Sequence, residues 1–462
     1  MKKHLHKFET TLWLLIKAAL YVSVLMIFIK VLGRESVGLT RLSRTLGITV
    51  STFLIVGMLF LSVYGRYDIG RRKSKPIIYS LTLTVLCTDV ITYLQLMIMK
   101  TNIPNIWAFR FQSLGLLFIA MILQILVIVI FTYAGNGLFF KIHKPEKCCV
   151  ITSSQKSLNE IAFAISKYKK QYEICEVLDY RSGNDKIKKA VRNAQSVFLY
   201  DVPAKVRTEV LRLSYKYKVN VYFNPEIEDV MEWNAKQYVL DDVYLLNKNV
   251  KALTMEQRIM KRLLDISLSL LLGILSAPFW IGGMLAVKLY DGGPVIFKQE
   301  RATIHGRRFE VYKLRTMKQN VENYSVKEND DRITPPGKIL RRTRIDELPQ
   351  LYNVLKGDMT FVGPRPEMIK NVEEYTEALP EFQYRLRMKA GLTGYAQITG
   401  KYNTTPKDKL LMDMMYIEQF SIWRDIQLIF QTAIVLLKTD STEAFNKNKY
   451  QCPYKFKKAD ED

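Results

Sequence analysis

The chain has 462 residues, a length typical of about three domains, and its 48% hydrophobic and 24% charged residues exclude an intrinsically disordered protein. Its five cysteines are odd in number and form no CxxC pair, which excludes a disulfide scaffold and indicates reduced thiols in a cytoplasm, without a zinc site. The formal net charge of +24 predicts an anionic partner, either a nucleic acid or a membrane surface.

Four apolar segments within residues 1–140 are predicted to cross a membrane. They lie at Leu12–Val31, Leu46–Tyr64, Ile77–Met99 and Phe111–Phe140. Each is long enough for a hydrocarbon core of roughly 30 Å, so the basic charge is attributed to an anionic lipid surface. Asp89 interrupts the third segment. An intramembrane acid can belong to a proton relay, but we favour a polar contact inside the helix bundle.

The charges of the loops predict the orientation of this bundle. The loops on one side (residues 2–7, 66–75 and 141–147) carry eleven Lys and Arg, whereas those on the other side (34–44 and 100–110) carry five. The positive-inside rule therefore predicts that the N-terminus and everything after the fourth segment are cytoplasmic.

Strand and helix patterns alternate over residues 146–250. Strands are predicted at Cys148–Thr152, Glu173–Leu178, Ser196–Tyr200 and Val219–Phe223, and helices at Ser157–Lys169, Asp185–Asn193 and Ala204–Tyr217. This alternation is typical of a parallel sheet in a small Rossmann-like α/β domain. The first strand runs into Thr152-Ser153-Ser154-Gln155 instead of a GxGxxG loop, so we favour a regulatory or structural domain over a cofactor site.

An uncharged segment of 22 residues, Ile266–Val287, is again long enough to span. Pro278 lies near its middle, where it removes a helix hydrogen bond and kinks the helix. Both flanks are basic, with Lys261 and Arg262 before the segment and Lys288 after it. We therefore predict a re-entrant hairpin helix over 261–290 that enters and leaves the membrane on the cytoplasmic side.

Beyond residue 290 the chain carries a dense series of short basic and glycine-containing motifs. They are GGPVIFKQER (292–301), YKLRTM (312–317), RRTRIDELPQL (341–351), FVGPRP (361–366) and GLTGYAQ (391–397). A carboxylate such as Asp346 can attack phosphorus, a second such as Glu347 can hold Mg²⁺, and arginines bind phosphate oxygens. An acidic pair beside arginines is usually a solvated helix face. The other motifs and the membrane hairpin favour a phosphorylated substrate at the lipid interface.

From about Lys261 to Lys438 these motifs resemble the bacterial sugar transferases known as polyprenyl-phosphate hexose-1-phosphate transferases. With four N-terminal spans and an α/β domain, the chain is similar to long-form members of the undecaprenyl-phosphate galactose or glucose phosphotransferase type. These start exopolysaccharide, capsule or O-antigen units. The resemblance implies a multi-pass protein of the bacterial plasma (inner) membrane with a cytoplasmic catalytic α/β domain over residues 291–445. A flexible tail is expected over 446–462.

The resemblance also implies a ping-pong reaction. Asp346 would attack the β-phosphate of a UDP-hexose, expel UMP and form a covalent phospho-sugar, which undecaprenyl phosphate would then accept. Glu347 matches the acidic partner that helps to bind Mg²⁺, so both carboxylates are expected to be catalytic. Substrate-binding roles are implied for Lys313, Arg315, Arg365, Arg301 and Gln397. Pro278 matches the family's helix break.

Three positions depart from the family pattern. Ala277 stands where a serine usually precedes the proline at the helix break, with Ser276 one place earlier. Thr303 stands where a glycine is usual, and Ala390 replaces the usual proline before Gly391. None of these departures involves the acidic pair.

Several alternatives stay open. The motifs handle phosphate and metal instead of the sugar ring, so an N-acetylated sugar-1-phosphate donor fits them as well as a simple hexose. A catalytically silent membrane scaffold is the non-enzyme alternative, but the intact motifs argue against it. A nucleic-acid partner is rejected because the arginines stand in turns beside a membrane hairpin, without a recognition helix. Anionic membrane lipids are expected partners, and a homodimer is possible.

Overall fold

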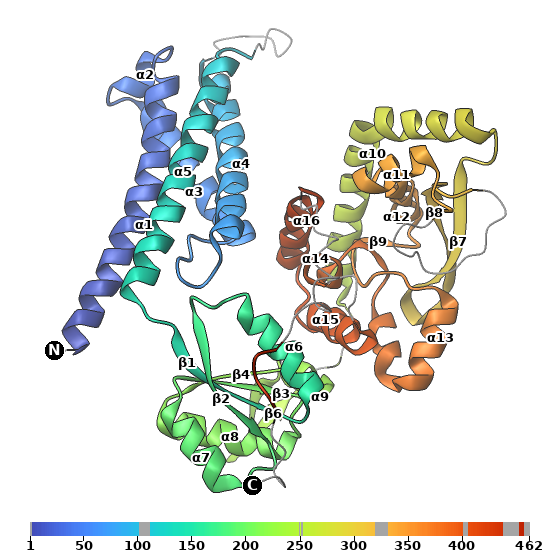
Figure 1. Ribbon diagram of the computed structural model, residues 1–462. Coiled ribbons are helices and arrows are strands. Elements are labelled where there is room, and N and C mark those ends of the chain that lie inside the picture. Colours follow the sequence, from blue (N-terminus) through green and yellow to red (C-terminus); the bar gives the residue numbers. More distant parts are fainter. Residues whose placement is uncertain are drawn as a thin grey trace. The chain divides into compact units, whose positions relative to one another are not determined.

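The computed structural model describes residues 2–100, 111–248, 250, 253–318, 331–400, 405–437 and 452–456. The chain divides into two compact units (Figure 1). The first comprises Met1–Asn224 together with Lys447–Asp462, and the second comprises Pro225–Asn446.

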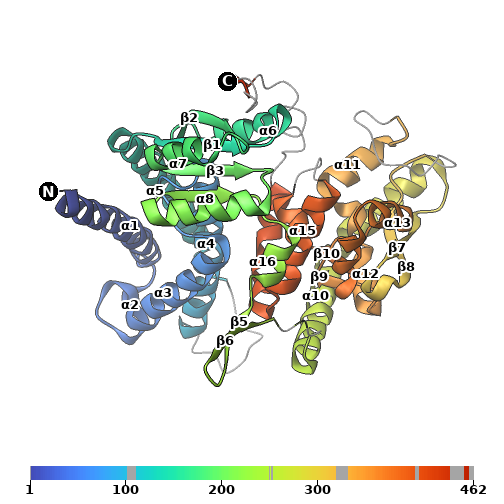
Figure 2. The same ribbon diagram turned by 90° about the horizontal axis from the view of Figure 1, so that it is seen from below.

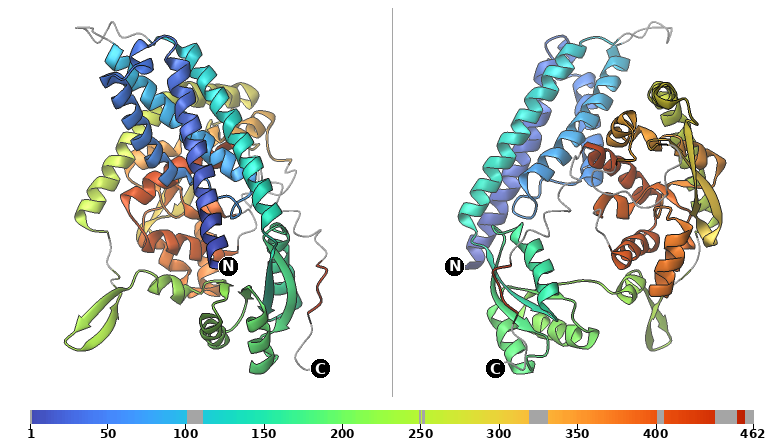
Figure 3. Two further views of the ribbon diagram at one scale, coloured as in Figure 1. Left: turned by 90° about the vertical axis from the view of Figure 1, so that its left-hand side faces the viewer. Right: turned by 45° about the vertical axis from the view of Figure 1, so that its right-hand side comes forward.

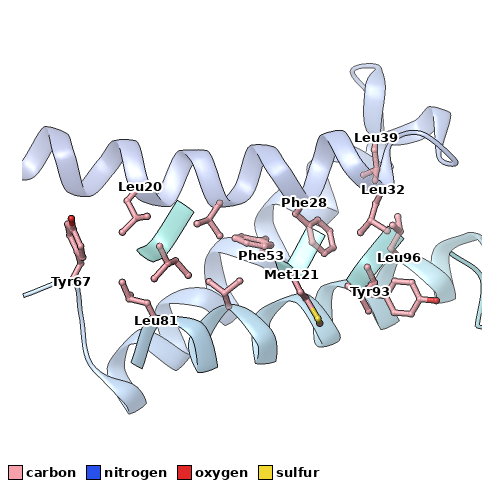
Figure 4. Packing of buried hydrophobic residues seen from close by; sticks show 14 of the residues in the cluster. Leu20, Phe28, Leu32, Leu39, Phe53, Tyr67, Leu81, Tyr93, Leu96 and Met121 are labelled. Carbon is pink, nitrogen blue, oxygen red and sulfur yellow. The ribbon is translucent and has the colours of Figure 1, made fainter. Parts of the chain in front are cut away.

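The first unit begins with a bundle of apolar helices. They are α1 (Lys2–Leu32), the short α2 (Val37–Thr40), α3 (Arg44–Tyr64), α4 (Ser74–Lys100) and α5 (Leu114–Ile142). Large side chains such as Phe28, Leu32, Leu81 and Met121 interlock in its interior (Figure 4). Asp89 is fully buried there and accepts a hydrogen bond of 3.2 Å from Gln124 Nε2, the polar contact within the bundle that we favoured.

A parallel sheet follows the bundle, as the strand and helix alternation predicts. Its order is β2 (Tyr172–Asp179), β1 (Glu146–Thr152), β3 (Ser196–Tyr200) and β4 (Asn220–Phe223). Helices α7 (Asn184–Asn193) and α8 (Ala204–Tyr217) pack on one face (Figure 2). Helix α6 (Gln155–Ser166) packs on the other face.

The structure places two chain segments differently from the prediction. The predicted α/β domain ends at residue 250, but from Pro225 on the chain belongs to the second unit, where Ile227 and Val230 of helix α9 (Ile227–Glu232) are buried against Leu410 and Met414. Residues 452–456 were assigned to a flexible tail, but they pack against the core of the α/β domain. The sequence shows that both segments carry apolar side chains, but tertiary packing decides which core buries them.

The described part of the second unit holds three two-stranded sheets, β5–β6, β7–β8 and β9–β10, among short helices. The strands are β5 (Lys236–Leu240), β6 (Val243–Asn247), β7 (Ile296–Ala302), β8 (Arg308–Leu314), β9 (Thr360–Val362) and β10 (Gly391–Thr393). The later helices are η2 (Ile304–Gly306), α11 (Pro335–Thr343), η3 (Ile345–Glu347), α12 (Gln350–Lys356), α13 (Ile369–Ala378), η4 (Pro380–Arg387), α14 (Tyr395–Thr399), α15 (Pro406–Glu418) and α16 (Ile422–Leu437). Strands β7 and β8 form an antiparallel hairpin, and β9 and β10 pair in parallel (Figure 3).

Helix α10 (Met255–Asp291) is the longest element of the second unit and contains Pro278. Figure 1 shows its two halves running in different directions. Arg262 in the first half donates to the carbonyls of Val354 and Leu355 at 2.7 and 2.6 Å. In the second half, a Cβ on Gly283 would lie only 2.9 Å from Leu314 Cδ1. Both halves therefore lie against the same domain.

Apolar side chains near the bend of α10 have no such cover within the unit. Ile274 is 74% exposed, and Leu275 and Phe279 are each 62% exposed. Within the described residues, five helices are long and apolar enough to cross a membrane, namely α1, α3, α4, α5 and α10. Together with the α/β domain, these helices make the chain a membrane protein with a further folded unit.

Candidate active site

The acidic pair lies in a tight connection between two helices. Helix α11 ends at Thr343, and Arg344 then adopts a left-handed conformation with φ 58°. The next three residues form the single turn η3, which carries Asp346 and Glu347. Ile345 packs into the cluster around Leu314 and Leu340, so the turn is anchored while its carboxylates face the end of β8.

Three cations surround the Glu347 carboxylate. Lys313 Nζ, on β8, lies 3.0 Å from Oε1, and Arg365 Nη2 lies 3.5 Å from the same oxygen. Arg344 Nη1 lies 3.7 Å from Oε2. Burial by itself would raise the pKa of Glu347, but the three cations outweigh it and lower the pKa to about 2. Glu347 is therefore ionised at every physiological pH.

Asp346 has different surroundings although it is the adjacent residue. It is 8% exposed, and its Oδ1 finds no hydrogen-bond partner among the described residues. Burial, and then the negative charge of Glu347, raise its pKa to about 6 against the opposing effect of Lys313 and arginines 341 and 344. A buried carboxylate oxygen without a partner, mostly ionised at neutral pH, is the chemical form that a nucleophile needs.

Arg365 stands in the loop after β9, in the Gly363-Pro364-Arg365-Pro366 turn. Its backbone carbonyl accepts a hydrogen bond of 2.7 Å from Arg385 Nη2. Arg385 is itself buried and paired with Asp413 Oδ2 at 2.7 Å. The loop that carries Arg365 is thus held from behind by a buried ion pair, while the Arg365 guanidinium remains 44% exposed toward solvent.

Arg301 lies close to this cluster. Its Nη1 donates to the Pro366 carbonyl at 3.3 Å, and its Nη2 donates to Gln299 Oε1 at 2.6 Å. Burial, and then repulsion from Arg365, lower its pKa to about 10, so it stays charged at neutral pH. Burial likewise lowers the pKa of Lys313, which Glu347 partly restores. The concentration of positive charge matches a substrate that carries several phosphate charges.

The remaining sequence-predicted residues have other surroundings in the described part of the chain. Arg315 pairs with Asp291 at the end of α10, and its Nε and Nη1 are buried without a partner in the described part of the chain. Gln397 donates to the Leu392 carbonyl at 3.0 Å, and no contact joins it to the Glu347 cluster in the described residues. Pro278 is exposed at the bend of α10. The Ser276 hydroxyl next to it lacks a hydrogen-bond partner among the residues described, so it does not stabilise the break.

Two buried residues beside the segments that carry Asp346 and Arg365 were not predicted from the sequence. Gln350, four places after Asp346, is 4% exposed, and its Nε2 has no partner within the described ranges. Its place in the DELPQL motif, one helical turn beyond the acid, was the available signal. Arg385 gave no comparable signal, because its link to the Arg365 loop spans 20 residues and exists only in the fold.

The donor set fits a magnesium ion that is shared with a substrate. Among the residues that the structure describes, no group of three or more His, Cys, Asp and Glu could hold a metal by itself. Magnesium, however, is commonly bound by one or two carboxylates together with substrate phosphates. Glu347, which is ionised and lies next to Asp346, is such a carboxylate.

Comparisons with known proteins agree with this geometry. A profile of the family described as bacterial sugar transferase matches residues 256–439. Over 189 residues the chain is 40% identical to the UDP-glucose:undecaprenyl-phosphate glucose-1-phosphate transferase of Caulobacter vibrioides. The aligned region covers 39% of this chain and 71% of that protein.

Two further relatives match over a smaller share of their length. The UDP-N-acetylgalactosamine-undecaprenyl-phosphate N-acetylgalactosaminephosphotransferase of Aeromonas hydrophila is 38% identical over 183 residues, 38% of this chain and 43% of the relative. The undecaprenyl-phosphate galactose phosphotransferase of Salmonella typhimurium is 34% identical over 218 residues, 43% of this chain and 45% of the relative. The match thus spans less than half of these two proteins. Because the Caulobacter relative is matched over more than two thirds of its length, the chain belongs to the bacterial sugar transferase family.

Proposed function

We propose that this protein transfers a hexose-1-phosphate from a UDP-sugar to undecaprenyl phosphate, releasing UMP and forming undecaprenyl-diphosphate sugar. This is the first membrane step of exopolysaccharide, capsule or O-antigen synthesis. The observation that carries the proposal is the buried, unpartnered oxygen of Asp346 beside the cations around Glu347. The names of the relatives, which include UDP-glucose and undecaprenyl phosphate, support the same substrates.

In the first half-reaction, an Asp346 carboxylate oxygen attacks the β-phosphorus of the UDP-sugar. A new P–O bond forms to Asp346, and the bond between that phosphorus and the bridging oxygen of UMP breaks. UMP leaves with the electron pair, and a sugar phosphate remains bound to the enzyme. Lys313, Arg365 and Arg301 supply the positive charge that stabilises the phosphate oxygens in this step.

In the second half-reaction, a phosphate oxygen of undecaprenyl phosphate attacks the same phosphorus. The bond to Asp346 breaks, its carboxylate is regenerated, and undecaprenyl-diphosphate sugar leaves. No proton transfer is required when the acceptor phosphate is ionised. Glu347 remains an anion throughout because its pKa is about 2, and it holds the surrounding cations in position.

Glu347 is the residue that would hold Mg²⁺ together with substrate phosphates, and the bound ion would neutralise negative charge on the phosphates and favour departure of UMP. The fit rests on the ionised state of the Glu347 carboxylate, which leaves the Asp346 oxygen for the attack on phosphorus. Removal of divalent ions with EDTA is expected to abolish UMP release, and readdition of Mg²⁺ is expected to restore it.

The membrane arrangement belongs to the same proposal. Helices α1, α3, α4 and α5 cross the bacterial inner membrane with the N-terminus in the cytoplasm, and α10 enters and leaves on the cytoplasmic side. A straight helix of 37 residues would be about 55 Å long, more than a bilayer core requires. The bend at Pro278, the anchoring of both halves on one domain and the exposed apolar side chains at the bend all support a re-entrant helix.

The test is UMP release from a panel of UDP-sugars by membranes that contain the protein, undecaprenyl phosphate and Mg²⁺. Asp346→Asn removes the nucleophile and is expected to reduce UMP release to background. Asp242→Asn changes an exposed aspartate in the β5–β6 turn and serves as the matched control with full activity. Absence of UMP from every sugar, with folded protein and confirmed acceptor, would contradict the transferase proposal and favour a silent scaffold.

An N-acetylated donor is the second candidate. It is favoured by one specific observation, the likeness to the Aeromonas protein named for UDP-N-acetylgalactosamine. The UMP panel separates the two candidates, because the preferred donor is the UDP-sugar that gives the highest kcat/KM.

A further inference from the structure

The α/β domain binds a segment from the far end of the chain. Residues 452–456, Cys-Pro-Tyr-Lys-Phe, lie beside α6 and the sheet without helical structure (Figure 1 and Figure 3). Cys452, Tyr454 and Phe456 pack against the cluster that contains Leu158 and Ala162 of α6. Pro453 and Lys455, which alternate with them, are exposed. This alternation is typical of an extended peptide lying with one face on an apolar groove.

A polar side chain recognises the backbone of the same segment. Gln155, at the first position of α6, accepts a hydrogen bond of 2.7 Å from the Phe456 N–H through Oε1. Its Nε2 donates to the Tyr454 carbonyl at 3.4 Å. One amide thus contacts backbone groups two residues apart, as a neighbouring strand does in peptide recognition by β-augmentation. The contacts to apolar side chains and to the backbone together define the tail groove, which is formed by Gln155 and by the buried cluster that contains Leu158 and Ala162.

We propose that the α/β domain is a receptor for the chain's own C-terminal segment, with residues 452–456 as the occupant of the tail groove. The sheet needs no contribution from this segment, because its four strands pair with one another. The occupant is assigned to the same chain because it is covalently attached. Tethering gives an effective concentration on the order of millimolar, which favours it over a segment from another molecule.

This assignment has a consequence for the second unit. Residues 225–446 are joined to the first unit through the backbone at Asn224 and also through the docked C-terminal segment. The unit that carries Asp346 is therefore attached to the first unit at both of its ends. The α/β domain acquires a function that needs no nucleotide, in agreement with the absence of a GxGxxG loop after β1.

Cys452 is a built-in probe of docking because it lies in the segment itself. The experiment measures its rate of reaction with a maleimide by mass spectrometry, in the full-length protein in lipid vesicles and in the denatured chain. We expect Cys452 to react at least about tenfold more slowly in the native protein. Gln155→Ala is expected to raise the native rate about threefold to tenfold, as the loss of one to two hydrogen bonds implies. Lys156→Ala, on an exposed neighbour in α6, is the matched control with an unchanged rate.

Replacing both aromatic side chains, Tyr454→Ala with Phe456→Ala, removes the apolar contacts and is expected to bring Cys452 to the denatured rate. A native rate equal to the denatured rate in the unmodified protein would overturn the proposal, as would a rate that neither variant changes. Intrachain docking is independent of protein density. Protection that falls when the protein-to-lipid ratio is lowered tenfold would assign the groove to a second copy's tail and overturn the tether. These readouts do not depend on transferase activity.

Discussion

At the scale of single residues, Asp346 and Glu347 are neighbours with opposite pKa shifts. Glu347 lies among three cations and has a pKa of about 2, whereas Asp346 is buried beside that negative charge and has a pKa of about 6. One carboxylate therefore stays ionised, and the other titrates just below neutral pH. This difference indicates that Glu347 is a permanent anion that holds the surrounding cations in position, and that Asp346 is the nucleophile.

The raised pKa of Asp346 predicts the pH dependence of UMP release. Only the ionised carboxylate attacks phosphorus, so single-turnover release should fall about tenfold per pH unit below pH 6 and level off above it. Arg341 lowers the pKa of Asp346. Arg341→Gln should therefore raise that pKa and shift the acid-side fall in UMP release, the acidic limb of the pH profile, to higher pH. Lys338→Gln removes an exposed charge from the same helix and should leave the limb in place. A flat profile between pH 5 and 7 would contradict this assignment.

The two departures from the family pattern at positions 303 and 390 contact each other. The Thr303 hydroxyl accepts a hydrogen bond of 3.1 Å from the Ala390 N–H and donates to the Asp358 carbonyl at 3.1 Å, all in a buried environment. A proline at 390 would have no N–H to donate, and a glycine at 303 would have no hydroxyl. We therefore predict that the two positions are energetically coupled.

A double-mutant cycle measures this dependence. Thr303→Val leaves the buried Ala390 N–H unsatisfied and should lower the free energy of unfolding by about 1–3 kcal/mol. Adding Ala390→Pro removes that N–H, so the double variant should lose less than the sum of the single variants. Thermal unfolding in detergent gives the three values. Strictly additive losses would show that the two positions are independent.

At the scale of elements, the loop after β9 is positioned by a helix pair behind it. Arg385 in η4 connects Asp413 of α15 to the Arg365 carbonyl. Arg385→Met should cost about 3–5 kcal/mol of stability because it leaves the Asp413 carboxylate buried without its partner. A double variant with Asp413→Leu should regain that stability.

The two variants separate positioning from folding. In Arg385→Met with Asp413→Leu, the Arg365 carbonyl still lacks its donor, so kcat/KM for the UDP-sugar should remain about tenfold low, as the loss of one charged hydrogen bond implies. UMP release across donor concentrations, measured beside the unfolding temperature, tests this. Full recovery of both stability and activity would limit Arg385 to a structural role.

At the scale of the whole molecule, the topology of α10 decides on which side of the membrane the site lies. Cysteines introduced one at a time at Glu256 and Tyr290, exposed near the two ends of α10, should be modified by an impermeant maleimide only after cells are permeabilised. A cysteine at Leu42, in the loop before α3, should react in intact cells. The exposed native Cys175 provides the cytoplasmic reference. Reaction of only one α10 end from outside would show that α10 crosses.

Much of the architecture could be predicted because it depends on local patterns. The apolar helices, the parallel direction of the strands in the sheet and the position of Asp346 follow from runs of hydrophobic residues, from strand–helix alternation and from short motifs. Segment ends and partners were less predictable. The predicted domain boundary at 250 and the predicted flexible tail over 446–462 missed the burial of Ile227 and Tyr454, because an apolar side chain does not specify which core will bury it.

The sequence by itself determined the membrane character, the sugar transferase motifs and the residue types of the site, because charge, hydrophobicity and motif order are properties of the linear chain. Only the tertiary structure decided the different pKa values of Asp346 and Glu347, the support of Arg365 by Arg385 and the docking of residues 452–456. Each of these depends on burial and on contacts between residues distant in the chain. Such contacts exist only once the backbone has brought those residues together.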